Sequence, residues 1–151
     1  MLLDSLLVPE TIVTPKSFVG LMSLYESNYL RLLRLIPEID RIDGCFRSRV
    51  AGDCELFVEV IETSRYTVTL SLTYHLPTNE GLLSDPDMMV RVYLDGQQAE
   101  VLSIGERQRH AALRRLVLEH KEELDRRWRF NVVLNKWLEY LSDQGHLILD
   151  R

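Results

Sequence analysis

Nine consecutive residues in the middle of the chain alternate between apolar and small polar side chains, and this pattern constrains the fold most strongly. The two sets interleave without a break: Tyr66, Val68, Leu70, Leu72 and Tyr74 against Thr67, Thr69, Ser71 and Thr73. A period of two puts one set on each face of a strand, so the segment is predicted to lie half-buried in an antiparallel sheet. Shorter alternations over residues 45–50 and 55–60 predict two preceding strands.

Short connections set the predicted register of this three-stranded meander. Three-residue loops join the strands, and slipping either register by one residue would turn every apolar side chain to the wrong face. The first loop also brings an arginine and a glutamate together as an opposite-charge pair on the exposed face. The predicted facing pairs are Ser48 with Leu56, Arg49 with Glu55, Val58 with Leu70 and Val60 with Val68.

A second hairpin is predicted around Asp95-Gly96, a dipeptide typical of tight turns between strands. It pairs residues 88–94 with residues 99–102, and the predicted facing pairs are Val90 with Val101, Val92 with Ala99, and Arg91 with Glu100. The segment before it, residues 76–87, is rich in proline, glycine and acidic residues and is predicted to be a mobile loop.

Both ends of the chain have helical periodicity. Thr14 is the predicted N-cap of the first helix, with Pro15 at its first position and Pro37 ending it. Its apolar stripe comprises Phe18, Leu21, Met22, Tyr25, Tyr29, Leu32, Leu33 and Ile36. A C-terminal stripe runs from Phe130 to Leu141, and Gly145 is the expected helix stop. Whether residues 105–128 form one helix with 129–143 or a separate one is left open.

These elements predict an α+β fold in a single domain spanning residues 1–151. Strands are grouped in the centre and helices lie at the ends, which is the α+β arrangement rather than the alternating α/β one. The expected order is an N-terminal helix, a three-stranded antiparallel meander plus a β-hairpin, and a C-terminal helix or helices packed on the sheet. Residues 1–13 are an N-terminal extension, and 151 residues suit one domain.

Composition excludes several classes of protein. The chain has 18 Lys and Arg against 23 Asp and Glu, a net charge of -5 that argues against wrapping nucleic acid. No apolar run is long enough to span a membrane, and the N-terminus does not resemble a signal peptide, so a cytoplasmic protein is expected. Cys45 and Cys54 are then reduced. No metal site and no cofactor are expected, and the four scattered histidines, His146 among them, are interpreted as ordinary residues.

The sequence names no reaction, because no glycine-rich nucleotide loop, zinc-protease motif or nucleophile elbow is present. Whether the protein is an enzyme is therefore left open, and the absence of these motifs favours a protein that is not an enzyme. One candidate binding group is Arg91 beside Tyr93, since a guanidinium and a phenol suit an anion or a carboxylate. Another is Arg65 at a turn, near Glu62. The competing interpretation is an exposed sheet face held by cross-strand pairs such as Arg91 with Glu100.

A third candidate is a basic stretch near the C-terminus. Residues 106–129 hold eight Lys and Arg against five Asp and Glu, an excess of three positive charges. Within it, Arg126, Arg127 and Arg129 alternate with two aromatic residues, a pattern that suits RNA or DNA. The interspersed acids favour a solvated helix face instead, so nucleic acid is not the favoured partner.

Four motifs in the same order resemble the YqiB-like family, small bacterial proteins of unknown function. They extend over roughly residues 16–146 and are Leu21-Met22-x-Leu24-x-Glu26-x-Asn28-Tyr29, Glu62-x-x-Arg65-Tyr66-Thr67, Met88-x-Val90-Arg91-x-Tyr93-x-Asp95-x-x-x-Ala99-Glu100-Val101, and Asn131-x-x-Leu134-x-x-Trp137-Leu138-x-Tyr140. The resemblance implies no activity. It singles out Glu26, Asn28, Arg65, Arg91, Tyr93 and Glu100 for testing. One departure is that residues 105–128 read as charged helix, where the family has an aromatic connection containing proline and asparagine.

The leading functional hypothesis is a small cytoplasmic accessory protein that binds another protein, whose identity the sequence does not reveal. The alternative is a small-ligand-binding protein or unusual enzyme that uses Arg65, Arg91 and Tyr93 with Glu62 or Glu100. RNA or DNA binding through residues 126–130 ranks third. No membrane partner is expected, and a homodimer formed through the edge of the second hairpin stays open.

Overall fold

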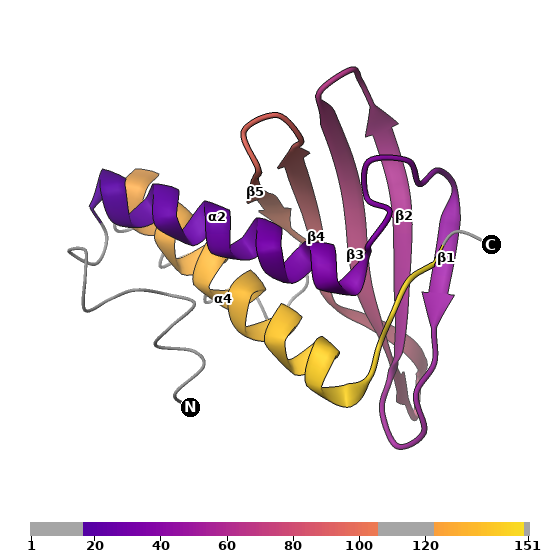
Figure 1. The fold of residues 1–151 in the computed structure, drawn as a ribbon. Helices are drawn as coiled ribbons and strands as arrows, with labels where there is room; N and C mark the ends of the chain where they lie inside the picture. The colour runs from indigo at the N-terminus through magenta and orange to yellow at the C-terminus, as the bar shows by residue number, and fades with distance from the viewer. Residues whose placement is uncertain (1–16, 106–122, 150–151) are drawn as a thin grey trace.

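The computed structural model describes residues 17–105 and 123–149, which form two helices and one antiparallel sheet (Figure 1). The sheet has five strands in the order β1-β2-β3-β4-β5, so every strand lies beside its neighbour in sequence. The elements are α2 (Phe18–Leu35), β1 (Cys45–Ser48), β2 (Glu55–Thr63), β3 (Thr67–Thr78), β4 (Gly81–Tyr93), β5 (Gln98–Ile104) and α4 (Glu123–Gln144). The predicted α+β class and element order are confirmed, and the hairpin joins the meander in one sheet.

The first helix begins later than predicted and ends as predicted. Ser17 is its N-cap, and the Ser17 hydroxyl accepts a hydrogen bond from the Gly20 amide at 3.0 Å. The predicted cap, Thr14, is therefore wrong, because a second capping residue stands closer to the apolar stripe. Residues 1–16 lie outside the described residues. The helix ends at Leu35, just before Pro37.

The β1–β2 register is confirmed, and the β2–β3 register is wrong by two residues. Ser48 faces Leu56, and Arg49 forms the expected ion pair with Glu55. Val60 faces Leu70 rather than Val68, because the turn lies further along the chain than predicted: Thr63 faces Val68, three residues from the predicted register, and the unopposed Ile61 reduces the difference to two. A shift of two residues leaves every side chain on its predicted face, so the apolar sets still share the core.

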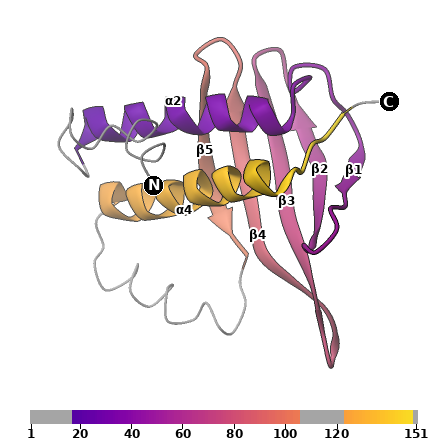
Figure 2. The same cartoon turned by 60° about the horizontal axis from the view of Figure 1, so that its bottom comes forward.

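The β4–β5 register is confirmed, but the loop predicted over residues 76–87 is wrong for most of its length. Strand β3 continues to Thr78 and β4 begins at Gly81, so the two form a long hairpin that extends beyond the other strands (Figure 2). Pro86 lies at a register shift, where a missing backbone N–H breaks no ladder bond. Mobility of this segment stays a prediction.

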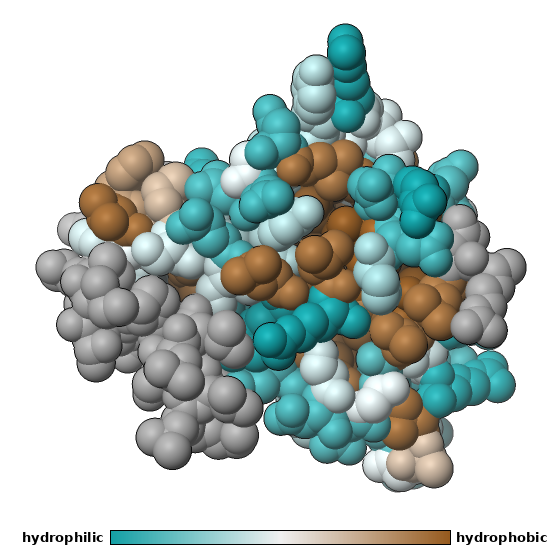
Figure 3. Space-filling view, viewed as in Figure 1, coloured by the Kyte–Doolittle hydropathy of each residue, from teal (hydrophilic) through white to brown (hydrophobic). Residues whose placement is uncertain are grey.

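Both helices lie side by side on the same face of the sheet and run in the same direction (Figures 1 and 2). Trp128 of α4 packs near the start of α2, against Leu21, Leu24 and Tyr25. The sides of α2 and α4 that face the sheet pack against the inward residues of the strands in one large core. Seen from the helical side, apolar and polar side chains alternate in patches over α2 and the adjoining strands (Figure 3).

The C-terminal helix is continuous from residue 123 to 144, so no break separates 123–128 from 129–143. Residues 106–122 lie outside the described residues, and the rest of that question stays open. Gly145 ends the helix at φ +98°, where the Gly145 amide donates to Ser142 and the His146 amide donates to Leu141. None of the described helices is long and apolar enough to cross a membrane.

Replacing Gly145 with alanine is expected to lower the free energy of unfolding by about 1 kcal/mol, because an alanine resists the left-handed conformation. Urea denaturation measures this change. Gly96→Ala is the matched control: Gly96 is outside the positive-φ set, and a new Cβ would meet its nearest neighbour at an ordinary 4.0 Å. Equal effects of the two substitutions would contradict the role of Gly145 as a helix stop.

Candidate functional site

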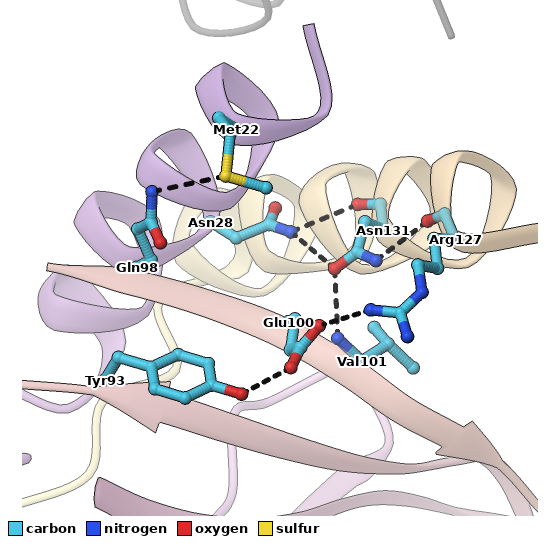
Figure 4. Close-up of polar contacts among 8 residues, drawn as sticks. All are labelled: Met22, Asn28, Tyr93, Gln98, Glu100, Val101, Arg127 and Asn131. Atoms are coloured by element: carbon cyan, nitrogen blue, oxygen red, sulfur yellow. Dashed lines mark hydrogen bonds and ion pairs between the residues drawn. The ribbon is translucent and has the colours of Figure 1, made fainter. Parts of the chain in front are cut away.

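Three residues singled out by sequence meet at the β5 edge of the sheet (Figure 4). The Tyr93 hydroxyl donates to Glu100 at 2.5 Å, and the Arg127 guanidinium donates to the other Glu100 oxygen at 3.3 Å. We call these three residues the Glu100 cluster. The Glu100 side chain is only 12% exposed, whereas Arg127 is 44% exposed. A carboxylate held between a phenol and a guanidinium thus joins β4, β5 and α4.

Two tyrosines at this edge hold their protons more tightly than usual. Burial raises the pKa of Tyr93, and its hydrogen bond to Glu100 raises it further. Burial likewise raises the pKa of Tyr25, although Arg127 opposes the increase. Both phenols therefore stay neutral hydrogen-bond donors at physiological pH and do not serve as bases.

A buried polar network, the asparagine bridge, lies beside the Glu100 cluster and comprises Asn28, Asn131 and Asn135. The Asn131 side-chain oxygen accepts from Asn28 at 3.2 Å and from the Val101 amide of β5 at 3.0 Å. The Asn131 amide nitrogen donates to the Arg127 carbonyl at 2.8 Å. Asn135 donates to Asn28 and to Ser27. The bridge connects α2, α4 and an edge strand at one point.

An ion pair continues this polar seam along the two helices. Arg31 of α2 and Glu139 of α4 lie 3.3 Å apart, with side chains that are only 5% and 12% exposed. Because the remaining seam is apolar, the pair and the asparagine bridge admit one lengthwise register of α2 against α4.

The other candidates are spread over the molecule. Glu26 and Glu62 are exposed, on α2 and at the end of β2. Arg65 lies at a turn with its guanidinium 5.3 Å from the Tyr66 ring, and Arg91 donates to Thr69 at 3.4 Å. Of the basic residues, Arg126 lies over the Phe130 ring, Arg127 belongs to the Glu100 cluster, and Arg129 is half-buried. No described contact joins Arg65 to Arg91.

Sequence reasoning missed a second polar cluster, the His146 cluster, at the opposite edge of the sheet. His146, with a fully buried side chain, contacts Ser48 of β1 through Nδ1 at 2.9 Å and Asp53 through Nε2 at 2.8 Å. Tyr74 and Tyr140 both donate to Asp53. A histidine just after the Gly145 helix stop and before apolar residues was the available signal that the tail docks on the core.

Hydrogen bonds set the charge state of Asp53. Burial acts to raise the pKa of its carboxyl, but bonds from Tyr74, His146, the Cys54 amide and Tyr140 together lower it. The same carboxylate and burial raise the pKa of Tyr74. Asp53 is therefore an ionised acceptor at neutral pH.

The His146 cluster contains serine, histidine and aspartate but lacks the features of a hydrolytic site. The Ser48 oxygen is buried and accepts the Leu147 amide at 3.3 Å, so the tail covers it. Neither of two hollows in the structure is lined by this cluster. One, of about 280 Å³, lies beside Leu30, Arg31, Leu33 and Arg34, and the other, of about 410 Å³, lies at the β3–β4 tip. Among the described residues, no group of His, Cys, Asp and Glu could hold a metal ion.

The face of the sheet opposite the helices is the third feature. We call it the open face because no helix or strand of the described residues covers it (Figure 1). Its side chains alternate with the core residues and comprise Arg47, Phe57, Glu59, Glu62, Thr69, Ser71, Thr73, Met89, Arg91 and Tyr93.

These observations define a two-layer α+β protein: two parallel helices on one face of a five-stranded antiparallel meander, with polar clusters at both edges. The chain belongs to a family of proteins of unknown function, DUF1249, whose family model matches residues 31–147. It is 28% identical over 132 residues to the uncharacterized protein YqiB of Escherichia coli K12, covering 87% of this chain and 93% of the relative. The YqiB proteins of strains O6:H1 and O157:H7 match equally. No solved structure matches significantly.

The predicted family resemblance is thereby confirmed, and so is the absence of an assignable reaction: neither the family description nor the YqiB names assign one. The candidate residues stay predictions, because neither the family description nor the YqiB names assign a role to any residue.

Asn131→Ala is expected to lower the free energy of unfolding by about 1–3 kcal/mol, because it leaves the buried Val101 amide without an acceptor. Chemical denaturation measures the loss. Asn79→Ala, at an exposed position of the β3–β4 hairpin, is the control and should change stability by less than about 0.5 kcal/mol. A near-neutral Asn131→Ala would show that the asparagine bridge does not hold the helices to β5.

Stability is expected to fall in acid through Asp53. Its folded pKa lies below the usual value of 3.8 for an aspartate, so its contribution to stability is complete above that value and disappears as the pH falls through the folded pKa. Asp53→Asn should cost about 1–3 kcal/mol at pH 7 and flatten the acid limb of stability against pH. Denaturation midpoints between pH 2 and pH 7 test this, with Asp43→Asn on the exposed β1 approach as control. Unaltered pH dependence in Asp53→Asn would refute the assignment.

Proposed function

We propose that this protein is a cytoplasmic interaction protein that binds a partner protein through the open face. The observation that carries the proposal is the one-sided covering of the sheet: both helices lie on one face, and the other presents a broad surface free of described elements. A five-stranded sheet with one uncovered face has room for a partner's surface.

The chemistry of the open face supports protein binding. Aromatic residues, methionine and arginine are enriched in protein interfaces, and Phe57, Met89, Arg91 and Tyr93 supply all of them. Phe57 stacks on His75, with ring centroids 5.6 Å apart, and the Arg47 guanidinium lies 5.6 Å from the centroid of the Phe57 ring. These stacked side chains are held in place before binding, which lowers the entropy cost of ordering them.

The central strand gives this surface a shallow polar floor. Thr69 and Thr73 are buried although they lie on the open face, because Arg91 and Asp87 bond to their hydroxyls. Larger side chains of β2 and β4, among them Phe57 and Met89, flank this floor. A shallow surface of this kind suits a protein better than a small molecule, which needs a concave pocket.

Charge indicates what the partner brings. Glu59 and Glu62 make no ion pair within the part of the chain that the structure describes, whereas Glu55 is paired with Arg49. A partner that places lysine or arginine opposite these two glutamates, and apolar side chains opposite Phe57 and Met89, complements the open face.

The small-ligand alternative has less support from the geometry. Tyr93 and Glu100 already bond to each other, Arg127 occupies the second carboxylate oxygen, and Arg65 points its guanidinium at Tyr66. Neither hollow described above is lined by these residues. RNA binding through residues 126–130 likewise competes with the Arg127 ion pair to Glu100.

A photo-crosslinking amino acid at position 89 in the full chain, expressed in the source cells, is expected to give a discrete partner adduct identified by mass spectrometry. The same group at Leu30, which is exposed on α2, is the positional control. Glu59→Lys combined with Glu62→Lys should reduce the adduct about ten-fold, because two favourable charges become repulsive.

The matched charge control is Asp43→Lys combined with Glu80→Lys, which alters exposed positions outside the open face. It should leave the adduct intact. Adducts at Leu30 and none at position 89, or equal losses in both double variants, would overturn the proposal. An adduct consisting of two copies of this chain would identify the partner as a second copy.

A further inference from the structure

We infer that residues 145–149, which we call the strap, open and close as a unit with β1 while the helices and the remaining strands stay folded. The contacts of His146 hold the strap closed. The inference does not rest on the open face, because the strap lies at the β1 edge, where the chain passes from α4 to the C-terminus (Figure 1).

The strap is held by a small set of directional bonds and by one core side chain, that of Ile148, which is 1% exposed. His146 contacts Ser48 at 2.9 Å and Asp53 at 2.8 Å, and the Leu147 amide donates to Ser48. The Ile148 amide donates to the Leu35 carbonyl at 2.8 Å, which satisfies an acceptor that the end of α2 would otherwise leave unpaired. Four parts of the fold therefore meet at the strap: α2, β1, the β1–β2 turn and α4.

Strand β1 has few attachments apart from the strap. It is four residues long and, within the described residues, pairs only with β2; Ser48 is its one buried side chain, and Phe46 is partly buried against the core. Ser48 is also the residue that bonds to both His146 and Leu147. A short edge strand with one buried side chain has a small opening free energy. Loss of the His146 contacts therefore destabilises β1 directly.

Gly145 supplies the pivot for opening. It has φ +98° immediately after α4, and a Cβ at this position would meet no atom of the described residues within 4 Å. The strap can thus rotate away from the sheet without disturbing α4. Opening leaves the backbone edge of β2 unpaired along residues 56–59, which face β1 in the closed state.

The side chains around His146 come from β1, the β1–β2 turn and β3. Asp53 from the β1–β2 turn and Ser48 from β1 contact its two nitrogens, and the Tyr74 ring of β3 packs against it edge-on, with centroids 6.0 Å apart. Tyr140 of α4 reaches the far oxygen of Asp53 at 3.2 Å from the exposed side. Tyr140, which belongs to α4 and not to the strap, thus shares Asp53 with His146.

Hydrogen exchange of the full-length protein tests the inference. In the unaltered chain, the Leu147 and Ile148 amides and those of β1 should exchange at least ten-fold faster than the core amides of Leu70 and Val90. His146→Ala should accelerate the strap and β1 amides a further ten-fold and leave the two core amides unchanged. Tyr140→Phe, the control that removes an Asp53 bond outside the strap, should change neither group.

A second readout uses the native thiols. In a Cys45→Ser background, Cys54 is the sole cysteine; it lies beside Asp53 and is half-buried. Its labelling by a disulfide reagent should accelerate about ten-fold in His146→Ala and in Ser48→Ala, which keeps the imidazole. Should His146→Ala not fold, Ser48→Ala and the unaltered chain carry the test. Uniform acceleration of all amides, or strap amides protected as strongly as Leu70, would overturn the inference.

Discussion

The contact between α2 and α4 is the constraint on which the rest of the structure depends. The whole sheet separates these helices in sequence, yet they lie side by side and in the same direction on one face (Figure 2). Asn28 and Asn131 meet within their seam, and the same Asn131 oxygen binds the Val101 amide. Buried polar groups must find partners, so this small network positions both helices and an edge strand together.

The helix α4 and its tail also protect both edges of the sheet. Near the start of α4, the Asn131 side chain accepts a hydrogen bond from the Val101 amide of β5, and the Arg127 guanidinium donates to the Glu100 carboxylate. Beyond its end, His146 and Leu147 bind Ser48 of β1. The unpaired backbone groups of an edge strand can pair with another chain. Through these contacts, α4 and its tail cover part of each of the two edges that the meander leaves. The region that no described element covers is a face rather than an edge, which is why we propose the open face as the binding surface.

Local patterns predicted the strands well and their alignment less evenly. Where a short connection joined two strands directly, as at residues 51–53 and at Asp95-Gly96, the facing pairs were right. At the second turn Thr63 faces Val68, three residues from the predicted register, and the unopposed Ile61 reduces the difference to two. A period-two pattern predicts the face on which a side chain lies and leaves its partner on the next strand open. The prolines of residues 76–87 indicated a loop, but Pro86 falls at a register shift where a strand tolerates it.

The sequence by itself determined the α+β class, the buried face of each strand, the ends of both helices at Pro37 and Gly145, and the family. These are consequences of periodicity and backbone chemistry, which act over a few residues. Only the tertiary structure decided that Asn28 is a buried bridge rather than a surface group, that Glu100 turns to Arg127, and that His146 joins Ser48 and Asp53. Each contact joins residues at least 27 positions apart, so it depends on how elements pack and is invisible to local pattern.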